Sequence, residues 1–247
     1  MENNLTFIDL FSGAGGFLRG IMNQGFEPIF SVENWQPAIN THKLNYPEVP
    51  IISNDIREIT NERLVEYTKG KKINVVVGGP PCQGFSTIGN RNPEDARNNL
   101  ILEFLRVVDV VRPDYFIMEN VRGLVSSKNG YFKDILLQKF KDIGYENVQC
   151  KIVCAADYGV PQKRYRVLFI GSLDDSEIEF PEHTNSKENP ETLKTHIMDL
   201  VGKENKIANH IPTNHNPIVK ERISYIKEGG GIHSDIPEHL LKGSRSD

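Results

Sequence analysis

Two patterns of hydrophobic and polar positions alternate along the first 173 residues. Short apolar runs predict strands at residues 6–11, 28–33, 51–53, 73–77, 115–118, 148–154 and 166–171. Longer stretches predict helices at 35–45, 62–69, 98–111 and 131–143, with another that ends near residue 25. The apolar run at 73–77 is typical of a strand that is buried on both faces. This alternation predicts an α/β fold with a doubly wound, mostly parallel sheet.

The pattern weakens after residue 173. Residues 174–215 are rich in Asn, Glu, Lys, Thr and Pro, and they predict loops with short helices such as 194–201. One more helix is expected at 217–227 before three consecutive glycines at 229–231 interrupt the pattern. We therefore expect a domain at residues 1–173 and an irregular extension at residues 174–247.

The composition is that of an ordinary soluble protein, with 38% hydrophobic and 25% charged residues. No run of about 18 apolar residues occurs and the first residues lack a signal-peptide pattern, so no membrane segment is expected. The three cysteines favour free thiols and a cytoplasmic location. The net charge of −4 argues mildly against a large nucleic-acid surface, although a local basic stripe can lie on an acidic protein.

Candidate functional residues follow the ends of the expected strands. Gly13, Glu33, Asp55, Cys82 and Glu119 each lie at or just past such an end. Ligands of doubly wound sheets bind beyond the carboxyl ends of the strands. The sequence therefore predicts one site, assembled along one edge of the sheet.

A glycine-rich turn, DLFSGAGGF at residues 9–17, joins the first strand to a helix. Glycines let a ligand approach the backbone amides at a helix start. The spacing fits neither a phosphate-binding loop nor a full dinucleotide fingerprint, and a purely structural turn is the alternative. Glu33 could accept hydrogen bonds from ribose hydroxyls, Asp55 could accept from an adenine amine, and Trp35 could stack on a purine. Each could instead be a surface acid or a buried aromatic, but together they suggest an adenosine-containing ligand.

A second motif, GGPPCQGFS at residues 78–86, places Cys82 on a loop stiffened by two prolines. Such a display favours a reactive thiol over the common alternative, a small core residue. Cys150 and Cys154 lie on one face of an expected strand, so we expect both in the core. No histidine lies at ligand spacing from them, and no metal site is expected.

Two further motifs carry charged side chains. Glu119, just after a buried strand, could have a raised pKa and act as a proton donor. Arg164 and Arg166 alternate with Tyr165, so both guanidinium groups are expected on one face of a strand. An exposed strand with surface charges is the alternative for the arginines.

Taken in order, FIDLFSGAGGF, GGPPCQGFS, ENV and QKRYR resemble the DNA (cytosine-5) methyltransferase family over about residues 5–172. The resemblance continues more loosely through PEHTNS and NHNPIVKERI. It implies a Rossmann-like methyltransferase sheet that uses S-adenosylmethionine and releases S-adenosylhomocysteine. It also implies a substrate cytosine that is flipped out of duplex DNA.

The resemblance assigns roles to residues at the matching positions. Cys82 would attack the cytosine ring, Glu119 would bind its nitrogen 3 and amine, and Arg166, with Arg164 beside it, would contact its carbonyl oxygen. Asn120 would brace the loop that carries Cys82. The cofactor contacts would be Phe11, Ser12, Gly13, Gly15, Gly16, Glu33, Trp35, Asp55, Ile56, Pro80 and Leu100. Residues 83–98 would form a mobile loop over the DNA, with contacts from Gln83, Gly84 and Ser86.

The sequence departs from the family pattern after Ser172. The family's Arg-rich Gln-Phe-Pro motif and its final Gly-Asn motif are not found in the residues that follow. We therefore expect two partners, duplex DNA and a second polypeptide that supplies target recognition, with a truncated chain as the alternative. The chain alone is then expected to methylate little. Family resemblance also suggests a bacterial restriction-modification setting and association with the nucleoid.

Two other functions remain open from the sequence. One branch of the family methylates a tRNA cytosine with the same Pro-Pro-Cys and Glu-Asn-Val motifs, although the PCQGFS and QKRYR contexts are closer to bacterial DNA enzymes. A non-enzymatic scaffold is the other alternative, and the intact Cys82, Glu119 and Arg166 argue against it.

Overall fold

The computed structural model describes residues 4–81, 99–126, 130–174, 176–185, 190–204 and 206–241. The chain forms two compact units, residues 1–192 and residues 193–247. The first unit holds the sheet. In the described residues, no helix has both the length and the apolar character that a membrane crossing requires.

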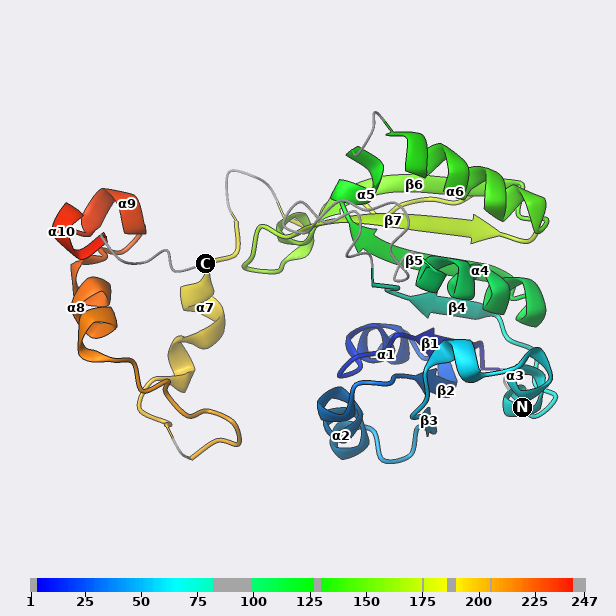
Figure 1. Cartoon of the computed structure of the whole chain (residues 1–247), viewed down its shortest axis with the longest axis horizontal. Coiled ribbons are helices and arrows are strands. Elements are labelled where there is room, and N and C mark those ends of the chain that lie inside the picture. The colour runs from blue at the N-terminus through cyan, green and yellow to red at the C-terminus, as the bar shows by residue number, and fades with distance from the viewer. Residues whose placement is uncertain are drawn as a thin grey trace. The chain divides into compact units, whose positions relative to one another are not determined.

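The described part of the first unit contains a seven-stranded sheet in the order β3-β2-β1-β4-β5-β7-β6 (Figure 1). Neighbours among the first five are parallel, and β7 is antiparallel to both β5 and β6. The expected doubly wound, mostly parallel α/β sheet is therefore confirmed. The strands are β1 (Thr6–Leu10), β2 (Glu27–Val32), β3 (Ile51–Ile52), β4 (Val75–Gly78), β5 (Tyr115–Val121), β6 (Asn147–Cys154) and β7 (Tyr165–Ser172).

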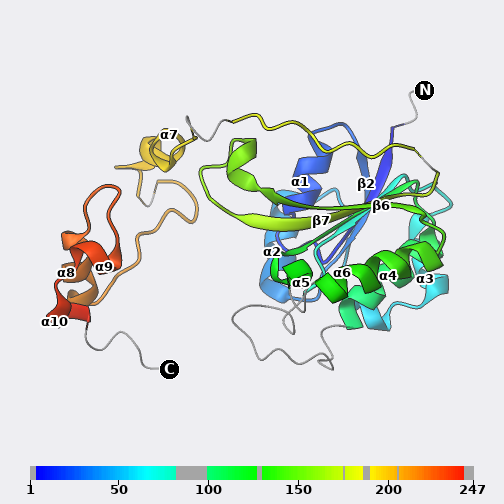
Figure 2. The same cartoon turned by 90° about the horizontal axis from the view of Figure 1, so that it is seen from above.

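Helices cover both faces of the sheet because apolar side chains alternate along the strands. Phe7 of β1 packs in a core cluster with Leu18 of α1, while Ile8 and Leu10 point into the larger cluster on the other face. Figure 2 shows α1 on one side of the sheet and α3, α4 and α6 on the other. The helices of this unit are α1 (Gly16–Met22), α2 (Gln36–Asn45), α3 (Asn61–Thr68), α4 (Asn99–Val111), α5 (Gly123–Ser126) and α6 (Tyr131–Asp142), with 3₁₀ turns η1 (Ile56–Glu58) and η5 (Ala155–Tyr158).

Some element ends differ from the expected ones for local reasons. The helix expected to continue to residue 25 ends at Met22, because Gly25 takes a positive φ of 83° and reverses the chain. The strand expected from residue 73 begins two residues later, at Val75, although the Asn74 amide still donates to the Thr6 carbonyl of β1 at 3.1 Å. The helix expected at 62–69 begins one residue earlier, after Thr60 accepts a hydrogen bond from the Arg63 amide at 3.3 Å.

Both described cysteines support the core, as expected. Cys154 is buried, and Cys150 is half-buried against the main core cluster. Burial raises the pKa of the Cys150 thiol to about 11, so it stays protonated and unreactive at neutral pH. No group of three or more metal-ligating side chains gathers anywhere in the described ranges.

The second unit is built from short helices. They are α7 (Leu193–Ile197), η6 (Met198–Leu200), α8 (Pro217–Tyr225), α9 (Ile232–Asp235) and α10 (Glu238–Leu241). The single helix expected at 194–201 is wrong, because the chain tightens into a 3₁₀ turn after Ile197. The start of α8 matches the expected position, because the Asn216 side chain accepts from the Val219 amide at 2.9 Å and Pro217 occupies the first helical position.

Candidate functional site

The strand order places a crevice beside β1. This strand lies between β2 and β4, so the sheet grows outward from it in both directions. At this reversal of strand order, helices leave for opposite faces and a crevice opens at the carboxyl ends. The glycine turn, the chain after β2 and the loop after β4 all lie at this edge of the sheet, and β4 points toward it at the left in Figure 1.

The glycine turn is held in an unusual backbone conformation. Phe11 takes a positive φ of 56°, which is costly for a residue with a side chain. Gly15 has a φ of 93°, and a Cβ there would stand 2.5 Å from the Tyr46 ring. Glycine at position 15 is therefore required both by its backbone angle and by close packing.

Glu33 ties this turn to the end of β2. Its Oε2 accepts from the Gly13 amide at 2.8 Å, and its Oε1 accepts from the amides of Asn34 and Trp35 at 2.9 and 2.8 Å. The carboxylate is thus fixed in place by three backbone donors. A carboxylate has about four acceptor positions, so one remains for a ligand hydroxyl.

Asp55 lies past β3 and is held by its neighbour. It accepts from the Arg57 amide at 3.0 Å, from Arg57 Nε at 2.9 Å and from Arg57 Nη2 at 2.5 Å. The bonds from the Arg57 side chain hold the pKa of Asp55 below its usual range, so the carboxylate stays charged. Any ligand amine that binds Asp55 must share its oxygens with Arg57.

A hollow opens between these elements. Of the expected cofactor contacts, five line it: Phe11, Glu33, Asp55, Ile56 and Leu100. The others do not line it, namely Ser12, Gly13, Gly15, Gly16, Trp35 and Pro80. The Trp35 side chain is 65% exposed. Its stacking on a purine stays a prediction.

The sequence reasoning missed five lining residues: Val32, Asn34, Asn54, Gly79 and Pro81. Asn34 directly follows Glu33, and Asn54 directly precedes Asp55. The same signal, a polar residue at a strand end, could have identified both asparagines. The other three lie within or next to motifs that were already singled out.

Two polar atoms near the turn are buried without a partner in the described residues. They are Asp9 Oδ1 and Ser12 Oγ. Asp9 is fully buried, and its Oδ2 accepts from the Leu18 amide at 3.2 Å. Burial raises the pKa of Asp9 to about 8, and the charge of Glu33 adds to the shift. Asp9 is therefore protonated at neutral pH and helps to anchor α1 to β1.

The end of β5 carries the acid that the sequence singled out. Glu119 forms an ion pair with Arg166 of β7, where Val121 is paired with Arg166 in the antiparallel ladder. Burial raises the pKa of Glu119, although Arg166 opposes the shift. This agrees with the expected raised pKa.

The two arginines differ in their surroundings. Arg164 is exposed and directly precedes β7, which begins at Tyr165, so of the two arginines only Arg166 lies within the strand. The Arg164 carbonyl accepts from the Ala155 amide at 2.9 Å and so continues the bonding between β6 and β7. The charge of Arg164 still acts on Glu119 and lowers its pKa slightly.

Asn120 connects β5 to the loop after β4. Its Nδ2 donates to the Pro80 carbonyl at 3.0 Å, and its Oδ1 accepts from the Val121 amide at 2.9 Å. Gly79 also lies close to β5, since a Cβ there would be 3.1 Å from Glu119 Oε2. The described loop ends at Pro81. The predicted residues Cys82, Gln83, Gly84 and Ser86 lie outside the described residues.

The structure therefore brings the two expected halves of the site to one edge. The hollow after β1, β2 and β3 is lined by acids, amides and apolar side chains. The Glu119–Arg166 pair lies beside Gly79, which itself lines the hollow. A ligand in the hollow and a group at Glu119 would thus meet next to the chain that leads into Cys82.

The sequence of this chain is similar to those of known methyltransferases. Residues 5–240 match the family described as C-5 cytosine-specific DNA methylase. The type II methyltransferase M1.HphI of Haemophilus parahaemolyticus is 40% identical over 96% of this chain and 64% of its own length. The type II methyltransferase M.AquIA of Picosynechococcus is 39% identical over 83% of this chain and 85% of its own length.

A solved structure agrees with these sequence relatives. It is described as a DNA modification methyltransferase encoded within a prophage of E. coli, with 32% identity and a TM-score of 0.66. The similarity covers 78% of this chain and 54% of that one. The chain thus spans less than two thirds of M1.HphI and of this solved protein. The matched residues and the fold together establish that the chain belongs to the C-5 cytosine-specific DNA methylase family.

Proposed function

We propose that this protein transfers a methyl group from S-adenosylmethionine to carbon 5 of a cytosine that is flipped out of duplex DNA, in a restriction-modification setting. One observation carries the proposal. The Glu119–Arg166 pair lies beside the Gly79–Pro81 loop, one residue before Cys82 and at the same edge as the hollow.

The hollow has the groups that an adenosine-containing cofactor requires. Glu33 is fixed by three amides and keeps acceptor capacity for ribose hydroxyls. Asp55 and the chain at Ile56 would meet the adenine edge, while Phe11 and Leu100 supply apolar walls. When bound, S-adenosylmethionine supplies an electrophilic methyl group.

The chemistry at the base follows from the neighbouring side chains. The Cys82 thiolate would add to carbon 6 of the cytosine and form a carbon–sulfur bond. Glu119, with its raised pKa, would donate a hydrogen bond to nitrogen 3 as negative charge develops on the ring. Carbon 5 would then take the methyl group and lose its proton, and elimination of Cys82 would restore the ring.

The remaining residues would hold the base and the loop in place. Arg166 would turn from Glu119 toward the cytosine carbonyl oxygen, which it can reach because its guanidinium lies at the same site. Asn120 would fix the approach of the Cys82 loop through Pro80. Exposed Arg122 and Arg164 flank this edge and would contact DNA phosphates.

We further propose that target recognition depends on a second polypeptide. The family's two late motifs are not found in this sequence. The net charge of −4 supports a weak grip on DNA by this chain. The second polypeptide would contribute most of the base-specific contacts in the grooves.

The test is methyl transfer from labelled S-adenosylmethionine, followed by identification of the methylated base. We would offer mixed-sequence duplex DNA or tRNA to the chain alone, to the chain with the polypeptide encoded immediately downstream, and to Cys82→Ser. We expect 5-methylcytosine in duplex DNA only with the second polypeptide, and none with Cys82→Ser. Methylated tRNA but not DNA would overturn the proposed substrate. Full activity of the chain alone would overturn the need for a partner.

A further inference from the structure

Arg106 of α4 makes polar contacts with three other residues through its guanidinium group. Its Nη2 donates to the Ile56 carbonyl at 3.0 Å, and its Nη1 donates to Asn61 Oδ1 at 2.7 Å. Its Nε and Nη2 also lie 2.8 and 2.7 Å from Glu103 Oε2, one helical turn away. The side chain is only 26% exposed, so these bonds are partly shielded from water.

These contacts join the two walls of the hollow. One wall is the chain Asn54–Ile56, which continues through η1 to Asn61 at the start of α3. The other wall includes Leu100, near the start of α4. Arg106 belongs to α4 but bonds to the chain on the opposite wall at two points.

The geometry points to Arg106 as a positioning residue that holds the Asp55–Ile56 wall at a fixed distance from α4, and so sets how selectively the site binds adenine. This inference rests on the proposed function, because it assumes that the ligand in the hollow carries an adenine ring. Arg106 itself does not line the hollow, so it acts through the carbonyl of Ile56 and the side chain of Asn61.

Arginine suits this role better than lysine. A guanidinium has five donors in a rigid plane and can bond in three directions at once. A lysine ammonium would keep the charge next to Glu103 but would not span Ile56 and Asn61 together. The substitution Arg106→Lys therefore loosens the wall while it preserves the helix and the ion pair within it.

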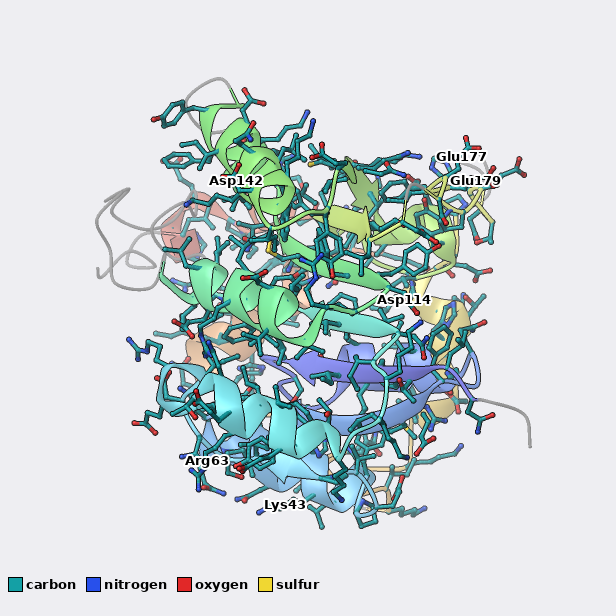
Figure 3. All side chains as sticks on the ribbon, turned by 90° about the vertical axis from the view of Figure 1, so that its right-hand side faces the viewer. Lys43, Arg63, Asp114, Asp142, Glu177 and Glu179 are labelled. Carbon is teal, nitrogen blue, oxygen red and sulfur yellow. The ribbon has the colours of Figure 1, made fainter. Side chains whose placement is uncertain are left out.

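The experiment compares two ligands on the full-length chain by calorimetry. S-adenosylhomocysteine carries the adenine amine, whereas S-inosylhomocysteine has a carbonyl oxygen in its place and a hydrogen on ring nitrogen 1, so the donor and acceptor at this ring edge are exchanged. We expect the wild-type chain to prefer the adenosyl ligand. In Arg106→Lys the preference should fall about tenfold, because the wall that meets the ring edge is no longer fixed. The matched control is Arg63→Lys, an exposed arginine on the neighbouring α3 (Figure 3), and it should leave both affinities unchanged.

Each other outcome has a definite meaning. If the wild-type chain binds neither ligand, the proposed function fails before Arg106 is tested. If it binds both equally, or if Arg106→Lys keeps the wild-type preference, the inference is overturned. An equal loss for both ligands indicates a purely structural role and also overturns it. Should Arg106→Lys fail to fold, Asn61→Ala removes one of the two cross-wall bonds and must lower the preference in the same direction.

Discussion

The two edges of the sheet use similar polar residues in opposite ways. At the amino ends of β1, β4 and β5, Asn74 donates to Asp114 at 2.7 Å and accepts from the Thr6 amide at 2.9 Å. Lys72 adds an ion pair to Asp114 at 2.8 Å. Figure 3 is viewed from the side on which Asp114 lies. Each of these polar groups is satisfied by another part of the same chain.

The carboxyl edge is different. Asp9 Oδ1 and Ser12 Oγ are buried without partners in the described residues, Phe11 has a positive φ, and burial raises the pKa of Glu119. A hollow opens at this edge, lined by Phe11, Glu33 and Asp55 among others. Strained and unsatisfied groups persist where they serve a ligand. The amino edge of the sheet therefore stabilises the fold, whereas the carboxyl edge is suited to ligand binding and chemistry.

The largest expected effect comes from Glu119→Gln at the carboxyl edge. The amide cannot supply the proton that offsets charge on the base, so methyl transfer should fall about a hundredfold or more. Unfolding should change little, because a partly desolvated acid is replaced by a neutral group of the same size. The rate is measured under conditions in which the wild-type protein methylates DNA. The matched control is Asp114→Asn. Asp114 directly precedes the first residue of β5, at the opposite edge of the sheet, and the variant should keep full activity.

Asn74→Ala tests the amino edge. The substitution removes three partly buried hydrogen bonds, two from Thr6 and one to Asp114, and should lower the free energy of unfolding by about 2 kcal/mol. Binding of S-adenosylhomocysteine by the folded protein should not change. Asn54 lines the hollow, so Asn54→Ala should have the opposite effect. It should weaken the binding of S-adenosylhomocysteine and leave the denaturation midpoint unchanged. If both variants changed stability and ligand binding in the same way, the proposed distinction between the two edges would be contradicted.

Asp9→Asn sharpens the comparison through pH. The unfolded carboxyl group titrates near its usual pKa of 3.8, and burial raises the folded pKa to about 8. The folded state therefore holds an extra proton between these values, and stability is lost as pH rises from about 4 to about 8. The wild-type chain should lose on the order of 5 kcal/mol over this window relative to Asp9→Asn. Parallel stability curves for the two proteins would contradict a protonated Asp9.

The smallest expected effect is that of Lys72→Ala. Its ion pair with Asp114 is on the surface, with the lysine side chain 71% exposed. Such pairs contribute about 0.5 kcal/mol or less, and salt screens them. Chemical denaturation should give a small difference between the wild-type chain and Lys72→Ala at low salt, and a still smaller one at high salt. A loss as large as that of Asn74→Ala would mean that charge, not the buried amide, stabilises this edge.

Much of the fold could be predicted from the sequence because the central strands β1 and β4 are buried on both faces and β5 on one. Apolar runs at residues 73–77 and 115–118 identify central strands with errors of only a few residues. One failure is the end of β5, which continues to Val121 because it pairs with β7 from far along the chain, whereas the local apolar run ends at Met118. The second unit was harder, because its short helices at α9 and α10 lack an apolar period that a sequence could reveal.

The candidate site was predictable for its acids and less so for its walls. Glu33 and Asp55 follow strand ends and Glu119 lies near the end of β5, so the topology alone places them at one edge. Asn34 and Asn54 obey the same rule and could have been found. The contact between Arg106 and the Ile56 carbonyl could not have been predicted, because every residue has a backbone carbonyl and the sequence does not indicate which one accepts.

We propose that the carboxyl edge of the sheet binds the cofactor. Two glutamates at opposite ends of β2 allow the most direct test. Glu33 follows the end of β2 at the hollow, and Glu27 begins β2 at the other edge, where it pairs with Lys71. The measurement is calorimetric titration of the wild-type chain, Glu33→Ala and Glu27→Ala with S-adenosylhomocysteine. The account predicts saturable binding that Glu33→Ala weakens at least about tenfold and that Glu27→Ala leaves unchanged. Equal affinities for all three proteins would contradict it.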